Sequence, residues 1–460
     1  MSLVEPSYLL FLVAAALLFR LVAKQPRVAP AVLLLLSLAF YASWNPLCCL
    51  PLLATATVDF SVGRALGRVT RPSLRRLLLL ASLATDLSLL VFFKYFNLLV
   101  PGAPFKVLFA AGISFYTFQS LSYVIDVYRG DRDPVGSFVS YAAFVSFFPT
   151  LLAGPITRAE TFFPRLESAG SPLKDEDGCA ALFLIALGFV KKCLIADTLA
   201  VNLSNRVFDV PGLYTSVEVL AAIYAYAVQI WGDFSGYSDI AIGSALLLGF
   251  RLKENFNRPY RSSDLTEFWR RWHISLSTWL RDYLFFALPG KRPGTPWPYL
   301  NLVITFGLGG LWHGASWTFA IWGLLHGVGL AVHRFVQSFG PRRPAAKKRP
   351  WKRALGTFAT FHFVAAAWVF FRCGTVGQAL DVFRVLASGT VGAGNLTLPI
   401  LAAVVAGLAG QLLPEGWLPA VQRRFVLLPA AVQASALLAV AALVRAVGGS
   451  AISPFIYFAF

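Results

Sequence analysis

The segment from Phe306 to Trp317 places a histidine where it could do chemistry inside otherwise apolar sequence. His313 lies between Gly310 and Gly314, and Trp312 precedes it. The Gly310-x-x-x-Gly314 spacing allows a close helix approach, and Trp312 can form the wall of a pocket. A neutral imidazole in such surroundings can accept a proton from a hydroxyl, as a general base for acyl transfer must do. A hydrogen-bonded core histidine stays the alternative.

A second segment combines charge with aromatic residues. Asp264 followed by Glu267 predicts a helix start. Five residues then recur at helical spacing and form one stripe: Phe268, Trp272, Leu276, Trp279 and Tyr283. The segment is too charged to span a bilayer, so we expect a helix at the cytosolic interface. It could present Arg270 and Arg271 to a phosphate-bearing cofactor. His273 lies on this expected helix, either with a catalytic task or as an interfacial histidine without one.

A third polar window, Trp231–Asp239, interrupts an apolar stretch from Leu220 to Phe250. It holds two carboxylates and two hydroxyls: Asp233, Ser235, Tyr237 and Asp239. Gly232 and Gly236 weaken a regular helix, which predicts irregular backbone that lines a cavity. A capped turn that joins two spans is the alternative.

Other chemistries lack their motifs. No HExxH or CxxC spacing supports a metal site, so none is expected. The chain has no G-x-S-x-G elbow, no P-loop and no GxGxxG. Its five cysteines form no disulfide framework and are interpreted as apolar filler.

The elements that must position these residues are membrane helices. Hydrophobic residues make up 57% of the chain and charged residues 13%, with a mean hydropathy of +0.66, whereas soluble domains carry about 25% charged residues. Apolar runs of near-spanning length recur: Tyr8–Val22, Leu77–Val100, Ala180–Leu199, Leu300–Trp312, Trp317–Val332, Phe358–Phe371 and Phe425–Val444. We predict an all-α integral membrane protein with about eleven spans plus interfacial or re-entrant helices. It forms a single domain over residues 1–460, with the chemistry in 105–335.

The net charge of +18 reflects topology rather than nucleic-acid binding. Lys and Arg gather in short loops, including Arg64–Arg76, Arg251–Arg292 and Pro341–Lys352. Short basic loops mark the cytoplasmic side, so we expect the N-terminus outside and the Arg64–Arg76 loop in the cytosol, with an uncharged C-terminus outside. The basic excess also suits anionic lipid or an anionic cytosolic cofactor.

Six segments together resemble the membrane-bound O-acyltransferase (MBOAT) family, nearest its bacterial alginate O-acetyltransferase branch. They are Gly112–Arg129, Ala153–Arg158, Asp233–Asp239, Glu254–Tyr260, Glu267–Asp282 and Gly309–Trp317. The segment Pro454–Phe458 fits as well. Two positions depart from the branch, Gly232 and the run Pro289-Gly290-Lys291, and both could reshape the expected tunnel.

The resemblance implies a helical fold around a tunnel that is reached from both membrane faces. It places the family's essential histidine at His313 and its second histidine at His273. It also implies an acetyl-CoA donor from the cytosol and a bacterial inner-membrane location. The acyl group then leaves on the outer face, to a polysaccharide or to a periplasmic acetyltransferase partner. We expect Tyr237 or Asn255 to stabilise the oxyanion.

Two alternatives stay open. One is D-alanyl transfer to teichoic acid from a carrier-protein thioester. The other is a polysaccharide or lipid flippase, which also needs polar groups at membrane depth but should work without a thioester and without His313.

Overall fold

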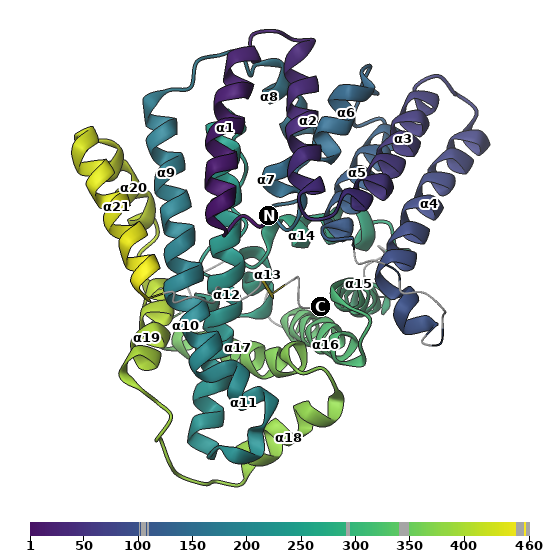
Figure 1. Ribbon diagram of the computed structural model, residues 1–460. Helices are drawn as coiled ribbons and strands as arrows, with labels where there is room; N and C mark the ends of the chain where they lie inside the picture. The colour runs from purple at the N-terminus through teal and green to yellow at the C-terminus, as the bar shows by residue number, and fades with distance from the viewer. Residues whose placement is uncertain are drawn as a thin grey trace. The chain divides into compact units, whose positions relative to one another are not determined.

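The computed structural model of the protein describes residues 1–100, 102, 107, 110–290, 295–339, 349–447 and 455–456 (Figure 1). Every regular element in these ranges is a helix, which confirms the all-α prediction. Expectations that concern Lys291, most of the basic loop 341–352, and Pro454 and residues 457–460 near the C-terminus lie outside the described residues.

Six helical stretches of the described chain are long and apolar enough to cross a membrane, and a seventh is counted if one bent pair is a single span. The six are Pro46–Leu66, Pro72–Asn97, Asp175–Asp209, Trp317–Ser338, Pro350–Arg372 and Ala430–Val447. The bent pair is α19 (Leu398–Leu412) with α20 (Trp417–Val426), which meet at 97°. The helices α1 (Pro6–Val22) and α2 (Val28–Ala42) are apolar but shorter.

The expected eleven spans exceed this number in part because some apolar runs form helices that are too short to be counted. The run Phe425–Val444 begins at the end of α20, and the rest of it lies in α21 (Ala430–Val447), which is one of the six. The run Leu300–Trp312 lies in α15 (Trp297–His313), whose 17 residues are at the short limit for a crossing.

The chain folds into two compact units that alternate along the sequence. The first comprises Met1–Ile185, Tyr237–Glu254 and Phe425–Leu427, and the second comprises Ala186–Gly236, Asn255–Arg424 and Leu428–Phe460. That the whole chain acts as one domain stays a prediction.

The first unit is held together by packing between its membrane helices. Its elements are α1, α2, η1 (Pro46–Cys48), α3 (Cys49–Leu66), α4 (Pro72–Leu99), α5 (Ile113–Arg129), α6 (Phe138–Val145), α7 (Phe148–Leu151), α8 (Ala159–Glu167) and the start of α9 (Asp175–Phe189). Fully buried Asp59 on α3 accepts hydrogen bonds from the hydroxyls of Ser82 on α4 and Ser120 on α5, each at 2.6 Å. These bonds tie three helices together where water cannot satisfy a carboxylate.

The second unit contains most of the residues that carry the predicted chemistry. After α9 the chain continues through the π-helical η2 (Val190–Ala196), α10 (Asp197–Leu199), η3 (Ala200–Ser204), α11 (Asn205–Asp209) and η4 (Pro211–Leu213) into α12 (Ser216–Leu247). Then follow η5 (Pro259–Arg261), α13 (Leu265–Arg271), α14 (Ile274–Trp279), η6 (Leu280–Phe285), α15, α16 (Trp317–Ser338), α17 (Pro350–Arg372), α18 (Val376–Ala387), α19, α20 and α21.

The predicted irregular backbone at Trp231–Asp239 is wrong, and so is the alternative of a turn, because α12 runs through this window without a break. The two glycines serve close packing instead. A Cβ on Gly236 would lie 2.7 Å from the carbonyl oxygen of Gly188, and one on Gly232 would lie 3.1 Å from that of Lys191. Glycine at these two positions lets α12 approach the π-helical segment closely. The backbone hydrogen bonds of the continuous helix outweigh the low helix propensity of glycine.

The single helix expected from Asp264 to Tyr283 is also wrong beyond its start. Asp264 does cap α13, since its side chain accepts a hydrogen bond from the backbone N–H of Glu267 at 2.9 Å. The chain then breaks at Trp272 and His273, and His273 adopts φ 41°, in the left-handed region. The break turns most of the aromatic stripe into the core of the unit, where Phe268 and Trp272 are buried.

Candidate active site

His313 lies at the tip of a hairpin that α15 and α16 form side by side (Figure 1). It is the last residue of α15, which ends because Gly314 is extended, and Ser316 then caps α16. The helices meet at Gly310 and Gly323, where a Cβ on either glycine would lie 3.1 Å from the Cα of the other. The close approach therefore depends on Gly310 with Gly323, not on the expected pair of Gly310 with Gly314.

Aromatic rings surround His313, whose exposed fraction is 5%. The ring centroids of Trp322 and Phe371 each lie 5.1 Å from that of the imidazole, and the centroid of Phe319 lies at 6.4 Å. The side chains come from α16 and α17, so tertiary packing builds the apolar surroundings that the local sequence predicted.

The neighbouring Trp312 connects the two predicted histidines. Its ring centroid lies 5.0 Å from that of His313 and 6.5 Å from that of His273, and its side chain is buried. The structure therefore brings together His313, Trp312 and His273 within one unit.

Asn255 holds His273 in its left-handed conformation. Its side-chain Oδ1 accepts hydrogen bonds from the backbone N–H and the hydroxyl of Ser275, both at 3.0 Å, and lies 3.3 Å from Nδ1 of His273. Its backbone carbonyl accepts from the N–H of Ile274 at 2.9 Å. This loop orients the imidazole, and a left-handed non-glycine residue held so firmly is typical of functional sites.

The imidazole of His273 is neutral at physiological pH. Its exposed fraction is 1%, and burial lowers its pKa to about 3. A ring in this state can donate or accept a hydrogen bond but carries no charge with which to hold an anion.

The two predicted phosphate-binding arginines have different surroundings. Arg270 is exposed. Arg271 is engaged by carboxylates, with Nη2 3.1 Å from Glu267 and 3.3 Å from Glu415. The backbone carbonyl of Arg271 also accepts from the N–H of Asn257 at 2.9 Å, close to the loop that holds His273.

Two further arginines lie near Glu415 in addition to Arg271, and neither is among the residues predicted for the site. Arg258 and Arg261 lie 3.9 and 3.7 Å from its carboxylate. Burial, the Arg258 guanidinium and then those of Arg271 and Arg353 lower the pKa of Arg261, while Glu415 opposes the shift. The density of basic residues from Arg251 to Arg292 was the available signal, but only folding brings residues 353 and 415 to it.

Tyr237 is fully buried in the first compact unit, whereas the other predicted site residues belong to the second. Its expected role at the oxyanion stays a prediction, as do the roles of Asn255 and the two arginines.

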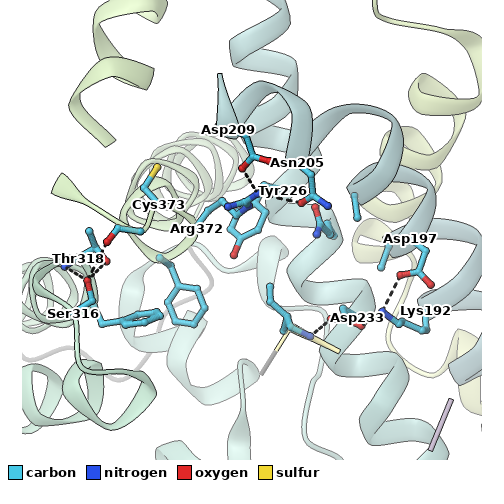
Figure 2. A pocket seen from close by; sticks show the side chains of 17 residues that line it. Lys192, Asp197, Asn205, Asp209, Tyr226, Asp233, Ser316, Thr318, Arg372 and Cys373 are labelled. Carbon is cyan, nitrogen blue, oxygen red and sulfur yellow. Dashed lines mark hydrogen bonds and ion pairs between the residues drawn. The ribbon is translucent and has the colours of Figure 1, made fainter. Parts of the chain in front are cut away.

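A cavity of about 530 Å³ lies in the second unit, and Figure 2 shows side chains that line it. Phe319 and Phe371 both line it and both contact His313. Its remaining lining residues are mostly polar or small: Lys192, Ala196, Asp197, Ala200, Asn205, Asp209, Tyr226, Gln229, Asp233, Ser316, Thr318, Arg372, Cys373, Gly374 and Ile456. Its size is that of a small-molecule pocket.

Charged groups on the cavity wall are paired (Figure 2). Lys192 lies 2.8 Å from Asp197 and 2.8 Å from Asp233, and all three are buried. Arg372 lies 2.9 Å from Asp209. Asp233 belongs to the polar window that the sequence indicated, but Lys192 was missed. Its presence within the apolar run Ala180–Leu199 was the signal that could have identified it, because a lysine at membrane depth requires a partner.

The fold and these residues define a polytopic helical membrane protein with a buried histidine site. The model of the membrane-bound O-acyltransferase family matches residues 132–373, which include both histidines and the cavity residues from Lys192 to Cys373. The protein belongs to this family, and it is an O-acyltransferase.

Three kinds of relatives show the range of the family to which the chain is similar. A protein of Pseudomonas putida named "Probable alginate O-acetylase AlgI" is 42% identical over 374 residues, which is 77% of this chain and 74% of that protein. A peptidoglycan O-acetyltransferase of Helicobacter pylori is 35% identical over 413 residues, 82% of this chain and 76% of that protein. A teichoic acid D-alanyltransferase of Bacillus subtilis is 28% identical over 279 residues, 58% of this chain and 70% of that protein.

Proposed function

We propose that the protein moves an acetyl group from a cytosolic thioester, acetyl-CoA, to a hydroxyl on the outer face of a bacterial inner membrane. The final acceptor is an extracytoplasmic polysaccharide, reached directly or through a periplasmic acetyltransferase partner. The similarity to proteins named for O-acetylation of alginate and peptidoglycan supports this choice. The observation that carries it is His313, whose aromatic shell shares Phe319 and Phe371 with a polar cavity.

His313 acts as the general base in this reaction. The imidazole takes the proton of the acceptor hydroxyl while the oxygen forms a bond to the thioester carbonyl carbon. The tetrahedral intermediate then expels the thiolate with the electron pair of the C–S bond, and the proton passes to sulfur. The ester and free thiol are the products, and the neutral imidazole is restored.

The donor phosphates are held by the basic residues near Arg271. Arg270 is exposed at this place, and guanidinium forks match phosphate geometry better than point charges do. His273, oriented by Asn255 and linked to His313 through Trp312, positions the donor or relays a proton as a neutral imidazole.

D-alanyl transfer from a carrier-protein thioester is the second candidate, favoured by the similarity to teichoic acid D-alanyltransferases. It is ranked lower because the identity to these proteins is 28–31%, against 41–43% for the alginate O-acetylases. Membership of an acyltransferase family gives the flippase hypothesis no support.

Purified full-length protein in proteoliposomes, supplied with radiolabelled acetyl-CoA, tests the proposal. We expect label to appear as a base-labile ester on an added saccharide or partner protein, with release of free CoA. A D-alanyl-loaded carrier protein should not replace acetyl-CoA. Transfer from the carrier protein alone would support the second candidate, and activity without any thioester would contradict both.

A further inference from the structure

Two polar side chains on one face of α12 point to a ligand in the cavity. Tyr226, Gln229 and Asp233 are spaced three and four residues apart, so they lie on one side of the helix, and all three line the cavity. Figure 2 shows Tyr226 and Asp233 among the lining side chains. The hydroxyl of Tyr226 and Oε1 of Gln229 have no hydrogen-bond partner among the described residues. Tyr226 is fully buried, and the exposed fraction of Gln229 is 9%.

Such atoms are costly to keep in a membrane protein. A buried donor or acceptor without a partner loses hydration without compensation, so an apolar residue of the same shape would be more stable at either position. A phenylalanine would fit where Tyr226 stands, since it differs only by the hydroxyl. Retention of both polar groups on the cavity wall is explained if a ligand completes their hydrogen bonds.

The charges of the cavity indicate which ligand. Three carboxylates and two cations line it, which gives a formal charge of −1. Lys192 is bracketed by two of the carboxylates, and Arg372 faces the third, Asp209. No cation is therefore in excess to hold a carboxylate or phosphate, and an anionic group would meet net repulsion at low dielectric.

We propose that this face of α12 recognises an uncharged, hydroxyl-bearing group of the acyl acceptor. Tyr226 donates a hydrogen bond to an acceptor oxygen, and Oε1 of Gln229 accepts one from a second hydroxyl. The two residues are specificity residues and take no part in bond making. The inference rests on the proposed function, and it names an uncharged polyol or hydroxyl side chain, rather than a polyuronate, as the group that enters the cavity.

A matched pair of tyrosines on the same helix tests it. Tyr226→Phe should raise the KM for a neutral gluco-oligosaccharide acceptor about fivefold, the effect of one hydrogen bond of about 1 kcal/mol. Its kcat and its KM for acetyl-CoA should stay unchanged. The ligand-free variant should melt at a higher temperature than the wild type, because a buried unpaired hydroxyl has been removed. Gln229→Leu should behave in the same way.

Tyr224→Phe is the control, because Tyr224 does not line the cavity and its hydroxyl lies 2.7 Å from Nε2 of His362. It should leave all kinetic constants unchanged and should not raise the melting temperature. If the Tyr226 hydroxyl had only a structural role, Tyr226→Phe would resemble Tyr224→Phe, with an unchanged acceptor KM and no rise in melting temperature. An unchanged acceptor KM in both Tyr226→Phe and Gln229→Leu would overturn the proposal.

The ligand class is tested by binding, independently of turnover. The neutral gluco-oligosaccharide should raise the melting temperature of the wild type and not that of Tyr226→Phe. An oligomannuronate of equal length should give a smaller shift. An equal or larger shift with the uronate would overturn the assignment of an uncharged ligand. Absence of acetyl transfer by the wild type, with these shifts intact, would instead count against the proposed function alone.

Discussion

The rings of His313 and Trp322 meet edge to face, with centroids 5.1 Å apart and an interplanar angle of 89°. Trp322 makes a second contact of the same length with His326 on its own helix. One indole thus separates the predicted general base from another buried histidine. This relationship matters for mutational tests, because replacing either His313 or His326 removes a ring that packs against Trp322.

Replacement of His313 should abolish acyl transfer without unfolding the protein. Loss of a general base costs about 10²–10⁴ in rate. His313→Gln keeps hydrogen bonding and similar volume but cannot take up the proton, so it should be inactive and should melt near the wild-type temperature. Turnover of the saccharide acceptor and thermal unfolding in detergent measure the two effects.

His333→Ala is the suitable control for this experiment, because His333 lies on the half-exposed end of α16. His326→Ala is not. His326 is fully buried, and its Nδ1 accepts a hydrogen bond from Trp269 at 3.3 Å. Near-normal turnover of His313→Gln would show that His313 is structural and would direct attention to His273.

His326 also marks a limit of the sequence analysis. The chain has no tryptophan directly beside it, yet Trp269, Trp322 and Trp368 surround it in the structure. Local sequence predicted helices, the Asp264 cap and the apolar surroundings of His313, because these depend on near neighbours. It could not predict which aromatic residues converge from distant helices.

The two wrong backbone predictions have a related cause. Glycines at 232 and 236 were interpreted as helix breakers, whereas packing against the π-helical segment makes them useful inside a continuous helix. Conversely, regular helical spacing concealed the break at His273. The hydrogen bonds that hold this break come from Asn255, 18 residues earlier, so no local pattern could reveal it.

We predict that Arg270 and Arg271 both bind the donor, and that Arg271 also stabilises the folded protein. Arg270→Ala should raise the KM for acetyl-CoA about fivefold and leave kcat and the melting temperature unchanged, as expected for loss of an exposed contact of about 1 kcal/mol. Arg271→Ala should also lower the stability by about 1–2 kcal/mol, because Glu267 loses its nearest cation. The double variant should raise KM more than it lowers kcat. Steady-state kinetics with varied donor decide the matter, and an unchanged donor KM in the double variant would remove both residues from the donor site.

Loss of Lys192 should be severe, because it lies between two buried carboxylates. Lys192→Met leaves Asp197 and Asp233 without their cation, at a cost of about 3–5 kcal/mol. Lys192→Met combined with Asp197→Asn should regain part of this stability, since only one carboxylate is then uncompensated. Thermal unfolding of the purified variants measures both. Equal melting temperatures for the single and double variants would show that the charges do not interact as described.

The topology can be tested with single cysteines. Thr70 and Ser7 are both exposed side chains, and the charge pattern predicts Thr70 in the cytosol and Ser7 outside. In a background with the five native cysteines replaced, an impermeant maleimide should label Ser7→Cys in intact cells and Thr70→Cys only after permeabilisation. The opposite pattern would reverse the donor and acceptor sides of the proposed reaction.

The stability of the protein should fall below about pH 6 in part because of His273. The folded-state pKa of about 3 lies below the ordinary value of about 6.5, so between these values the unfolded chain binds a proton that the folded protein excludes. The free energy of unfolding therefore rises with pH through this window, by at most about 1.4 kcal/mol per pH unit, and the histidine contributes no further pH dependence above pH 7. Glu267 and Glu415, whose pKa values are lowered in the folded state, act in the same direction near pH 4, so the wild type alone cannot isolate the effect.

His273→Gln removes only the histidine contribution. Melting temperatures from pH 4.5 to 7.5 should therefore converge at low pH for the variant and the wild type, even if the variant is less stable at pH 7. Parallel curves at all pH values would show that the imidazole is protonated as easily in the folded protein as in the unfolded chain.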